Sequence, residues 1–366
     1  ADKVPVISEM ELASEVAEAE LIAVTGSNGK TTTTTMIQKM VDHDRRAGKA
    51  VYAGNIGIPA SRVAQAVTAD DTLVLEVSSF MLVGTTTFHP HIAVLTNIFS
   101  NHLDYHKTRE NYVAAKMKIT ANQTADDYFV VNFDSPELRE LSEQSAAQVV
   151  PFSREARSQA GAYELNGDLY FKDEKLMAAS DIKVPGDHNV ENALAAIAVA
   201  KIKGVSTAAI VAVLRSFGGV RHRTQYVLEA DGRQYYNDSK ATDMEATEMA
   251  LKGFTAPVVL IAGGLDRGYT FEKLVPSLKA HVKAVVLVGQ TAKLLEDAAK
   301  KAGIQTIRLS ENVETAVPTA YELSDAGDII LLSPANASWD QYPNFEVRGD
   351  RFIKAVEQLT GKQEEK

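Results

Sequence analysis

Short apolar runs of strand length alternate with amphipathic segments of helix length in the first part of the chain. The runs predicted to be strands are Leu21–Val24, Ala50–Ala53, Thr72–Val77, Ile92–Thr96 and Tyr128–Asn132. The segments predicted to be helices are Ser8–Glu18, Thr32–Val41, Ser61–Val67 and Glu110–Ala121. Because strands that alternate with helices form βαβ units, this order predicts a parallel sheet with helices on its faces.

The pattern changes after Val149, where a hairpin is predicted around Asn166-Gly167-Asp168. Two helices are predicted after it: Val190–Ile202, which ends at Gly204, and Thr207–Phe217, which ends at Gly218-Gly219. A second hairpin is predicted at Asp231-Gly232, and strand–helix alternation then resumes.

We therefore expect an α/β protein of two domains. Residues 1–218 form a parallel-sheet domain, and residues 219–366 form a smaller, Rossmann-like α/β domain. The polar tail Gly361–Lys366 is expected to fray.

The strongest local motif lies between the first strand and the helix that follows it. It contains Gly26, Ser27, Asn28, Gly29, Lys30, Thr31 and Thr32. In this context small residues let backbone N–H groups surround phosphate oxygens, and the lysine reaches the terminal phosphates. The threonine hydroxyl after the lysine is suited to Mg²⁺. The motif is a shortened phosphate loop (P-loop) and predicts an ATPase-type domain; the alternative is an ordinary glycine turn before a helix.

Three further residues of the first domain are candidates for a metal–phosphate site. Glu76 ends a strand and His102 follows the next one, at the sheet edge where ligands bind in parallel sheets. Taken alone, Glu76 is equally well a solvated carboxylate, and His102 a structural histidine. Lys116 lies within a predicted helix and, by itself, indicates a surface lysine.

Hydroxyl, amide and charged residues follow three predicted strands of the second domain. These segments are Asn237–Thr242, Gly263–Gly268 and Ser333–Ser338. They are suited to ribose, phosphate or carboxylate contacts, although solvated loops explain Asn237–Thr242 equally well.

Composition narrows the function classes. The net charge of −10 argues against binding the phosphate backbone of a nucleic acid. The absence of cysteine excludes disulfides, cysteine-ligated zinc and thiol catalysis. No apolar stretch reaches the roughly 18–20 residues that a membrane span requires. We expect a cytoplasmic protein without nucleic-acid or membrane partners.

Taken together, these segments resemble the Mur ligase family, the ATP-dependent amide ligases of peptidoglycan synthesis, and within it the ligases that add D-glutamate. The matching segments are Thr25–Thr32, Gly54–Gly57, Glu76–Phe80, Thr96–Asp104, Ala114–Lys116, His188–Leu194, His222-Arg223, Asn237–Thr242 and Ser333–Gly349. The resemblance implies a monomer that activates UDP-N-acetylmuramoyl-L-alanine with ATP as an acyl phosphate and joins it to D-glutamate.

The resemblance also implies roles for individual residues. Phosphate and two Mg²⁺ ions would be held by Lys30, Thr31, Glu76, His102 and a carbamylated Lys116. The nucleotide would contact Asn189, Asn192, His222, Arg223 and Asp238. The muramoyl substrate would face Asn55 and Ser79, and D-glutamate would be held by Lys240, Thr242, Arg267, Ser338 and Phe345.

The chain departs from the family pattern at several positions. Met81 replaces a common glutamine, Asp243 a common asparagine and Arg267 a common lysine. Only 29 residues precede Lys30, which is too few for the uridine-binding domain of the family. We therefore expect a catalytic core without that domain. Two alternatives stay open: a ligase like folylpolyglutamate synthetase, and a truncated ATP-binding module without turnover.

Overall fold

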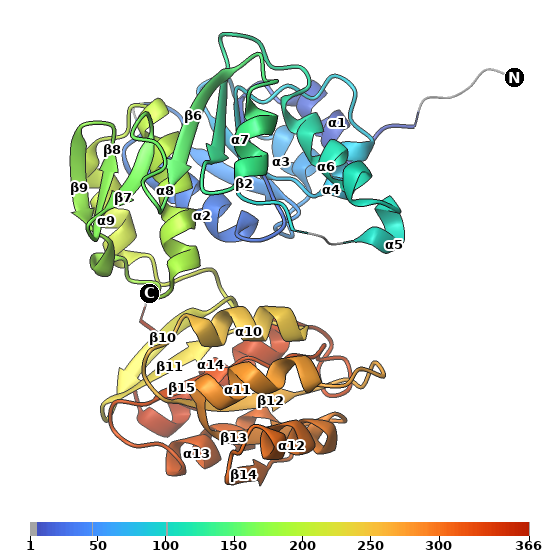
Figure 1. Cartoon of the computed structure of the whole chain (residues 1–366), viewed down its shortest axis with the longest axis vertical. Coiled ribbons are helices and arrows are strands. Elements are labelled where there is room, and N and C mark those ends of the chain that lie inside the picture. The colour runs from blue at the N-terminus through green and yellow to red at the C-terminus, as the bar shows by residue number, and fades with distance from the viewer. Residues whose placement is uncertain (1–5, 46, 100–101, 366) are drawn as a thin grey trace, which may run out of the picture. The chain divides into compact units, whose positions relative to one another are not determined.

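The apolar runs of the first half of the chain form the centre of one nine-stranded sheet (Figure 1). The computed structural model describes residues 6–45, 47–99 and 102–365. The chain divides into two compact units by its contacts. The N-terminal unit contains Ala1–Lys183 and Asp187–Phe217, and the C-terminal unit contains Val184–Gly186 and Gly218–Lys366.

The sheet of the N-terminal unit has the order β2-β3-β1-β4-β5-β6-β7-β8-β9. Its strands are β1 (Glu20–Thr25), β2 (Ala50–Gly54), β3 (Thr72–Glu76), β4 (Ile92–Leu95), β5 (Tyr128–Asn132), β6 (Gln148–Ser153), β7 (Ala162–Leu165), β8 (Asp168–Phe171) and β9 (Glu174–Ala178). Pairing is parallel from β2 to β7 and antiparallel from β7 to β9. The predicted parallel sheet and its hairpin are confirmed, whereas β6 and β9 are additions.

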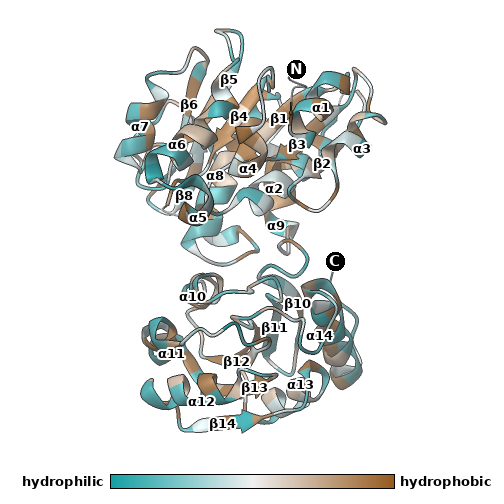
Figure 2. Ribbon diagram, turned by 90° about the vertical axis from the view of Figure 1, so that its right-hand side faces the viewer, coloured by the Kyte–Doolittle hydropathy of each residue, from teal (hydrophilic) through white to brown (hydrophobic). Residues whose placement is uncertain are grey.

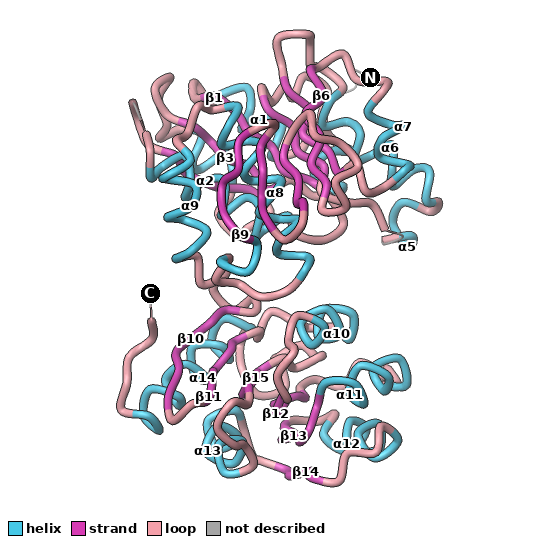
Figure 3. Tube along the Cα trace, turned by 60° about the vertical axis from the view of Figure 1, so that its left-hand side comes forward, coloured by secondary structure: helices cyan, strands magenta, loops and turns pink. Residues whose placement is uncertain are grey.

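The helices of the N-terminal unit flank this sheet (Figure 3). They are α1 (Glu9–Val16), α2 (Lys30–His43), α3 (Ala60–Ala64), α4 (Ser79–Val83), α5 (Leu103–His106), α6 (Arg109–Met117), α7 (Pro136–Ser142), α8 (Asp187–Ile202) and α9 (Thr207–Ser216). Short 3₁₀ turns lie at Lys118–Thr120 and Ala179–Asp181. An unbroken run of eight residues in α8, from Ala193 to Ala200, is buried, and α8 packs against α2. A helix that is apolar on all sides is stable only when it is covered in this way.

The C-terminal unit has a six-stranded sheet of order β10-β11-β15-β12-β13-β14. Its strands are β10 (Gln225–Ala230), β11 (Arg233–Asn237), β12 (Val258–Gly263), β13 (Val282–Val288), β14 (Thr306–Leu309) and β15 (Ile329–Leu332). Only β10 and β11 pair antiparallel within this sheet. The helices are α10 (Met244–Lys252), α11 (Val275–His281), α12 (Ala292–Lys301), α13 (Val313–Glu322) and α14 (Phe345–Thr360), with a 3₁₀ turn at Glu272–Leu274.

Both faces of the C-terminal sheet are covered. In β15, Ile329 and Leu331 belong to one apolar cluster, and Ile330 and Leu332 belong to the cluster on the other face. This alternation follows from the two-residue period of a strand. The apolar positions follow the strands in both units (Figure 2). The fold is thus α/β in both units, as the sequence predicts.

The sequence analysis predicts no element after Ser338, where the chain forms helix α14. Asn344 caps this helix by accepting a hydrogen bond from Val347 N. The tail, expected to fray, makes hydrogen bonds to β10 at residues 362–365: Glu365 N donates to Val227 O at 2.8 Å, and Lys362 Nζ donates to Glu229 O at 2.8 Å. Lys366 lies outside the described residues. No helix in the described part of the chain is long and apolar enough to cross a membrane.

Candidate functional site

The predicted phosphate loop connects the buried end of β1 to the first turn of α2. Gly26 and Gly29 adopt φ angles of 150° and 83°. A Cβ atom at Gly26 would collide with Thr96 Oγ1, and one at Gly29 would collide with Asn192 Oδ1. Both positions therefore require glycine, for conformation and for space. The loop presents the N-terminus of a 14-residue helix, which favours an anion.

The end of β4 fixes the shape of this loop. Thr96 Oγ1 donates to Asn28 O at 2.7 Å, and Asn28 N donates to Asn97 Oδ1 at 2.8 Å. Ser27 N donates to Asn97 O at 2.9 Å. The roles of Thr96 and Asn97 were missed by the sequence reasoning. Their position at a strand end beside the loop was the available signal.

Two lysine side chains meet at one carbonyl of the phosphate loop. Lys30 Nζ donates to Gly26 O at 2.9 Å, and Lys116 Nζ donates to the same oxygen at 2.8 Å. Lys116 is buried, so the expectation of a surface lysine is wrong. Burial, with the charge of Lys30 as a second cause, lowers the pKa of Lys116 to about 6. Its amine is therefore neutral at pH 7.

Glu76 is buried at the carboxyl end of β3, beside the end of β1. Its Oε1 accepts a hydrogen bond from Asn55 Nδ2 at 2.7 Å, whereas its Oε2 is buried without a hydrogen-bond partner. A buried carboxylate oxygen without a partner is costly unless a cation or a donor supplies one. This orphaned oxygen fits a divalent metal ion, and Asn55 orients the carboxylate that would bind it.

Aromatic rings connect His102 to the phosphate loop. The ring of His102 lies 5.0 Å from that of Phe80 and 6.3 Å from that of Tyr112. The Tyr112 hydroxyl shares a hydrogen bond of 2.9 Å with Ser27 Oγ. The signal for Tyr112 is its position four residues before Lys116 on the same helix.

Ser79 is buried and shares a hydrogen bond of 3.0 Å with His106 Nε2. His106 also packs on Phe80, with 5.4 Å between ring centroids. The side chain of Ser79 is thus engaged within the N-terminal unit, and the role of His106 was not anticipated.

Asn189 and Asn192 lie on α8, and Asn192 contacts the first turn of α2. Asn192 Oδ1 accepts from Thr33 Oγ1 at 3.2 Å, and Asn192 Nδ2 donates to Asn189 Oδ1 at 3.2 Å. Thr31 and Thr32 are buried in the first turn of α2. The structure therefore brings both asparagines to the phosphate loop.

In the C-terminal unit, Asp238 follows β11 and is buried. Its Oδ1 accepts from Thr224 N at 2.9 Å, and its Oδ2 accepts from Ser333 Oγ at 2.8 Å. Burial raises the pKa of Asp238 to about 6, although these hydrogen bonds oppose the shift.

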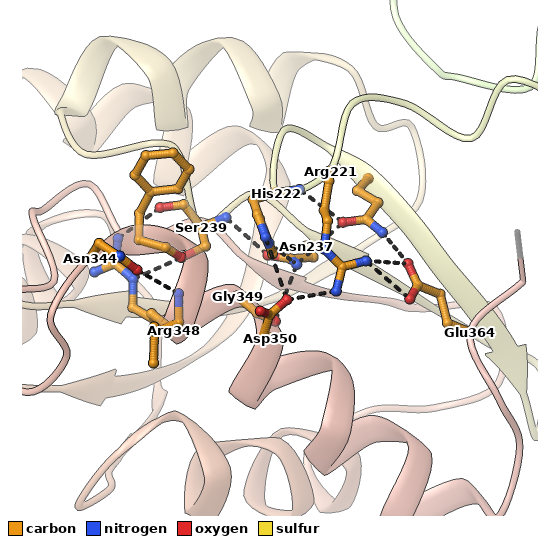
Figure 4. A network of polar contacts seen from close by, with 12 residues as sticks. Arg221, His222, Asn237, Ser239, Asn344, Arg348, Gly349, Asp350 and Glu364 are labelled. Carbon is orange, nitrogen blue, oxygen red and sulfur yellow. Dashed lines mark hydrogen bonds and ion pairs between the residues drawn. The ribbon is translucent and has the colours of Figure 1, made fainter. Parts of the chain in front are cut away.

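His222 and Arg223 form a turn next to Asp238. His222 is buried with φ of 64°, and Asn237 Nδ2 lies 2.9 Å from its Nδ1 (Figure 4). Burial, aided by the charge of Arg221, lowers the pKa of His222 to about 4, so the ring is neutral. Arg223 Nε is buried without a hydrogen-bond partner. A ligand group would supply that missing acceptor.

The buried Arg348 of α14 holds the loop that follows β11. Its Nε donates to Ser239 Oγ at 3.0 Å and its Nη2 donates to Ser239 O at 2.8 Å (Figure 4). Ser239 Oγ donates to Phe345 O at 2.8 Å, and Lys240 Nζ lies 5.6 Å from the centre of the Phe345 ring. Thr242 N donates to Lys240 O. Lys240, Thr242 and Phe345 thus belong to one cluster.

The loop after β12 adjoins the loop after β15. Leu265 N donates to Ala337 O at 2.9 Å, and the Arg267 guanidinium lies 5.1 Å from the centre of the Trp339 ring. Ser338 Oγ is buried without a hydrogen-bond partner. The predicted residues Arg267 and Ser338 therefore lie on neighbouring loops.

Two of the departures from the family pattern have local explanations. Asp243 caps α10 by accepting from Ala246 N at 2.8 Å, and aspartate and asparagine cap helices equally well. Met81 packs against the core of the N-terminal unit.

The candidate residues thus form one group in each unit, at the carboxyl ends of the parallel strands. Within the described residues, no three His, Cys, Asp or Glu side chains gather to hold a metal. The phosphate loop, the helix N-terminus and the two lysines define a phosphate-loop nucleotide-binding protein.

Comparisons with known proteins agree with this class. Residues 24–200 match the Mur ligase middle domain, and residues 222–336 match the Mur ligase, glutamate ligase domain. The chain is 67% identical over 362 residues to the UDP-N-acetylmuramoylalanine–D-glutamate ligase of Lactiplantibacillus plantarum. The match covers 99% of this chain and 79% of that protein. It is 63% identical over 358 residues to the ligase of the same name from Latilactobacillus sakei, and this match covers 98% of the chain and 79% of that protein.

Among solved structures, the MurF ligase of Thermotoga maritima in complex with ADP matches with a TM-score of 0.66 and 20% identity. The match covers 96% of this chain and 83% of that one, and at this identity it indicates the fold alone. The chain belongs to the Mur ligase family.

Proposed function

We propose that this chain is an ATP-dependent ligase that joins D-glutamate to UDP-N-acetylmuramoyl-L-alanine. The observation that carries the proposal is the glycine-bounded phosphate loop with Lys30 and the neutral Lys116 on one carbonyl. The names of the relatives at 67% and 63% identity support the substrates. We also propose an ATP-binding domain in residues 1–218 and a C-terminal ligase domain in residues 219–366.

The proposed reaction has two steps. The muramoyl carboxylate attacks the γ-phosphorus of ATP, the bond to the bridging oxygen breaks, and an acyl phosphate and ADP form. The amine of D-glutamate then attacks the acyl carbon, phosphate leaves with the C–O bond electrons, and the amine loses a proton. Lys30 and the N–H groups of the loop neutralise charge on the transferred phosphoryl group.

The residues of the N-terminal unit fit a magnesium-binding role. Thr31 and Glu76 would hold one Mg²⁺, and the orphaned Oε2 of Glu76 supports this assignment. His102 and a carbamate on Lys116 would hold a second. Mg²⁺ supplies charge neutralisation at the phosphates when it is bound. Asn55 and Ser79 stay the proposed contacts of the muramoyl substrate.

A neutral amine is the form of lysine that reacts with CO₂. Lys116 would attack the carbon of CO₂ and release one proton, giving a negatively charged carbamate next to Lys30. The pKa of about 6 supports this step, because the amine of an ordinary lysine is almost entirely protonated at pH 7.

The C-terminal unit would supply the remaining contacts. His222, Arg223 and Asp238 would bind the nucleotide, and D-glutamate would be held by Lys240, Thr242, Arg267, Ser338 and Phe345. In the N-terminal unit, Asn189 and Asn192 are the proposed nucleotide contacts. The orphaned Arg223 Nε and Ser338 Oγ support ligand contacts at these positions. A cytoplasmic monomer without nucleic-acid or membrane partners completes the proposal.

The test is phosphate release from ATP with UDP-N-acetylmuramoyl-L-alanine and D-glutamate, each omitted in turn. Release that requires both substrates, with formation of the amide product, is the expected result. ATP binding without such release would favour an ATP-binding module, and turnover only with a folate substrate would favour a folylpolyglutamate synthetase.

The carbamate has a separate test. Lys116→Ala should abolish turnover, and short carboxylic acids should restore part of it, whereas Lys118→Ala serves as the matched control in the same segment. With ¹³C-labelled bicarbonate, a carbamate signal should appear in the wild type and be absent from Lys116→Ala. Full turnover by Lys116→Ala without added acid would refute the role.

A further inference from the structure

Residues 362–365 lie along the outer edge of the C-terminal sheet, next to β10. Glu365 N donates to Val227 O, and the Tyr226 hydroxyl donates to Glu365 Oε1 at 3.3 Å. Glu364 N is itself held by Glu357 Oε1 at 3.0 Å. This segment is therefore docked by its backbone as well as by its side chains.

The carboxylate of Glu364 contacts Arg221, which precedes β10 (Figure 4), and Gln225, the first residue of β10. Arg221 Nη1 lies 3.3 Å from Glu364 Oε2, and Gln225 Nε2 donates to Glu364 Oε1. Arg221 Nη2 donates in addition to Asp350 Oδ1 at 2.6 Å. Glu364 is the less exposed carboxylate of the two, with 16% of its side chain accessible against 54% for Asp350.

These partners surround His222. Gln225 Oε1 accepts from His222 N at 2.8 Å, and Asp350 Oδ1 lies 3.6 Å from His222 Nε2. Residues 222 and 224 both have positive φ angles, of 64° and 40°, which side-chain-bearing residues adopt only when neighbours enforce them. Between them stands Arg223, with its unpartnered Nε.

We infer that Glu364 is a positioning residue for nucleotide binding, which acts by holding Arg221 and Gln225 on either side of the His222–Thr224 turn. This inference rests on the proposed function, because it assumes that His222 and Arg223 contact the nucleotide. Loss of the carboxylate leaves Arg221 with Asp350 as its partner and Gln225 with His222 N, so the strained turn is held less firmly and samples conformations in which Arg223 is misplaced. Affinity for the nucleotide falls, and affinity for the amino acid falls less, because the turn reaches that group only through the hydrogen bond from Lys240 N to His222 O at 2.8 Å.

The experiment compares wild type, Glu364→Ala, Glu364→Gln and the control Gln363→Ala, which alters an exposed neighbour in the same segment. Calorimetry measures binding of ADP with Mg²⁺, and steady-state ligation gives KM for ATP and for D-glutamate. Glu364→Ala should weaken nucleotide binding and raise KM for ATP by about tenfold, the factor of one charge-assisted hydrogen bond. Glu364→Gln, which keeps an acceptor for Gln225, should show a smaller loss. KM for D-glutamate should rise by a clearly smaller factor than KM for ATP, and the Tm should stay near wild type.

The outcomes separate this inference from the proposed function. Equal nucleotide affinity in wild type and Glu364→Ala overturns the positioning role, as does a loss that Gln363→Ala shares. Equal increases in both KM values, with a lowered Tm, also overturn it in favour of a purely structural role. Nucleotide binding without ligation in wild type refutes the proposed ligase alone, and a wild type that binds no nucleotide refutes both.

Discussion

Burial shifts the pKa of ionisable side chains in the proposed site, among them Lys116 and Asp238. Lys116 becomes neutral because an ammonium ion is poorly solvated there and lies near Lys30, and the pKa of Asp238 is raised to about 6 by the same desolvation. A shifted pKa in a cluster of this kind is a property that reactive groups share. The two groups belong to different units, so each can be tested by itself.

The first prediction concerns Lys30. Lys30→Ala removes the cation that lies on the phosphate loop and should lower ATP affinity or turnover at least about 100-fold. Calorimetry with ATP and Mg²⁺ and a phosphate-release assay measure the two quantities. Lys39→Ala, on an exposed position of the same helix, is the control. Unchanged binding together with unchanged turnover would contradict the phosphate-loop assignment.

The second prediction concerns the pH dependence of stability at Asp238. Its folded-state pKa of about 6 exceeds the ordinary value of 3.8, so the native state binds more protons than the unfolded state between these pH values. The free energy of unfolding of the C-terminal unit, which contains Asp238, should therefore fall as pH rises from 4 to 6. Asp238→Asn removes this pH-dependent loss. Its free energy of unfolding relative to that of the wild type should therefore rise by up to about 3 kcal/mol over that interval.

Denaturant unfolding of both proteins at pH 4 and pH 7 measures the difference. Asp297→Asn, at an exposed position, should show no such gain. If the difference in free energy of unfolding between Asp238→Asn and the wild type were the same at both pH values, the raised pKa would be wrong.

At the scale of elements, the site depends on where strands end and helices begin. The loop between β1 and α2 closes because β4 supplies Thr96 and Asn97, and because α8 brings Asn192 against Gly29. Parallel strands place all of these ends at one edge of the sheet. Single positions in the loop are therefore constrained by two other elements, β4 and α8.

Gly29→Ala should destabilise the protein by about 1–3 kcal/mol and weaken ATP binding, because it adds strain at φ of 83° and a collision with Asn192. Gly57→Ala is the matched control, since Gly57 has φ of 109° but nothing within 4 Å of an added Cβ. Any loss of stability in Gly57→Ala therefore measures backbone strain alone. Adding Asn192→Ala to Gly29→Ala should recover part of the stability, as thermal unfolding would measure. No difference between the two glycine variants would show that the collision is relieved without cost.

At the scale of the whole molecule, each unit has its own apolar core. Leu73 in β3 belongs to the core of the N-terminal unit, and Leu331 in β15 to one of the two clusters of the C-terminal unit. Separate cores permit separate unfolding transitions, so a single free energy of unfolding does not describe such a chain.

Leu331→Ala should destabilise the C-terminal unit by about 2–5 kcal/mol, because it opens a cavity in a fully buried position. Leu73→Ala should do the same to the N-terminal unit. In calorimetry each variant should shift a different transition. If both variants shifted one common transition by similar amounts, the two units would unfold as a single cooperative body.

Much of the fold follows from the local pattern of apolar, polar and turn residues. The strand β3 is a continuous apolar run because both of its faces are covered, and the hairpin between β10 and β11 follows from Asp231-Gly232. The helix α14 was missed because its first turns contain charged residues and Gly349, while the apolar positions that bury it, Phe352, Ile353 and Val356, lie further along.

The sequence by itself determined the alternation of strands and helices, the phosphate loop and the candidate residues at strand ends, since these depend on neighbours in the chain. Tertiary structure alone decided that Lys116 is buried on a carbonyl 90 residues away and that Glu76 keeps an oxygen without a partner. It also decided that Glu364 reaches Arg221. Solvation and hydrogen-bond partners come from groups distant in sequence, and they set charge state and orientation, which local spacing does not encode.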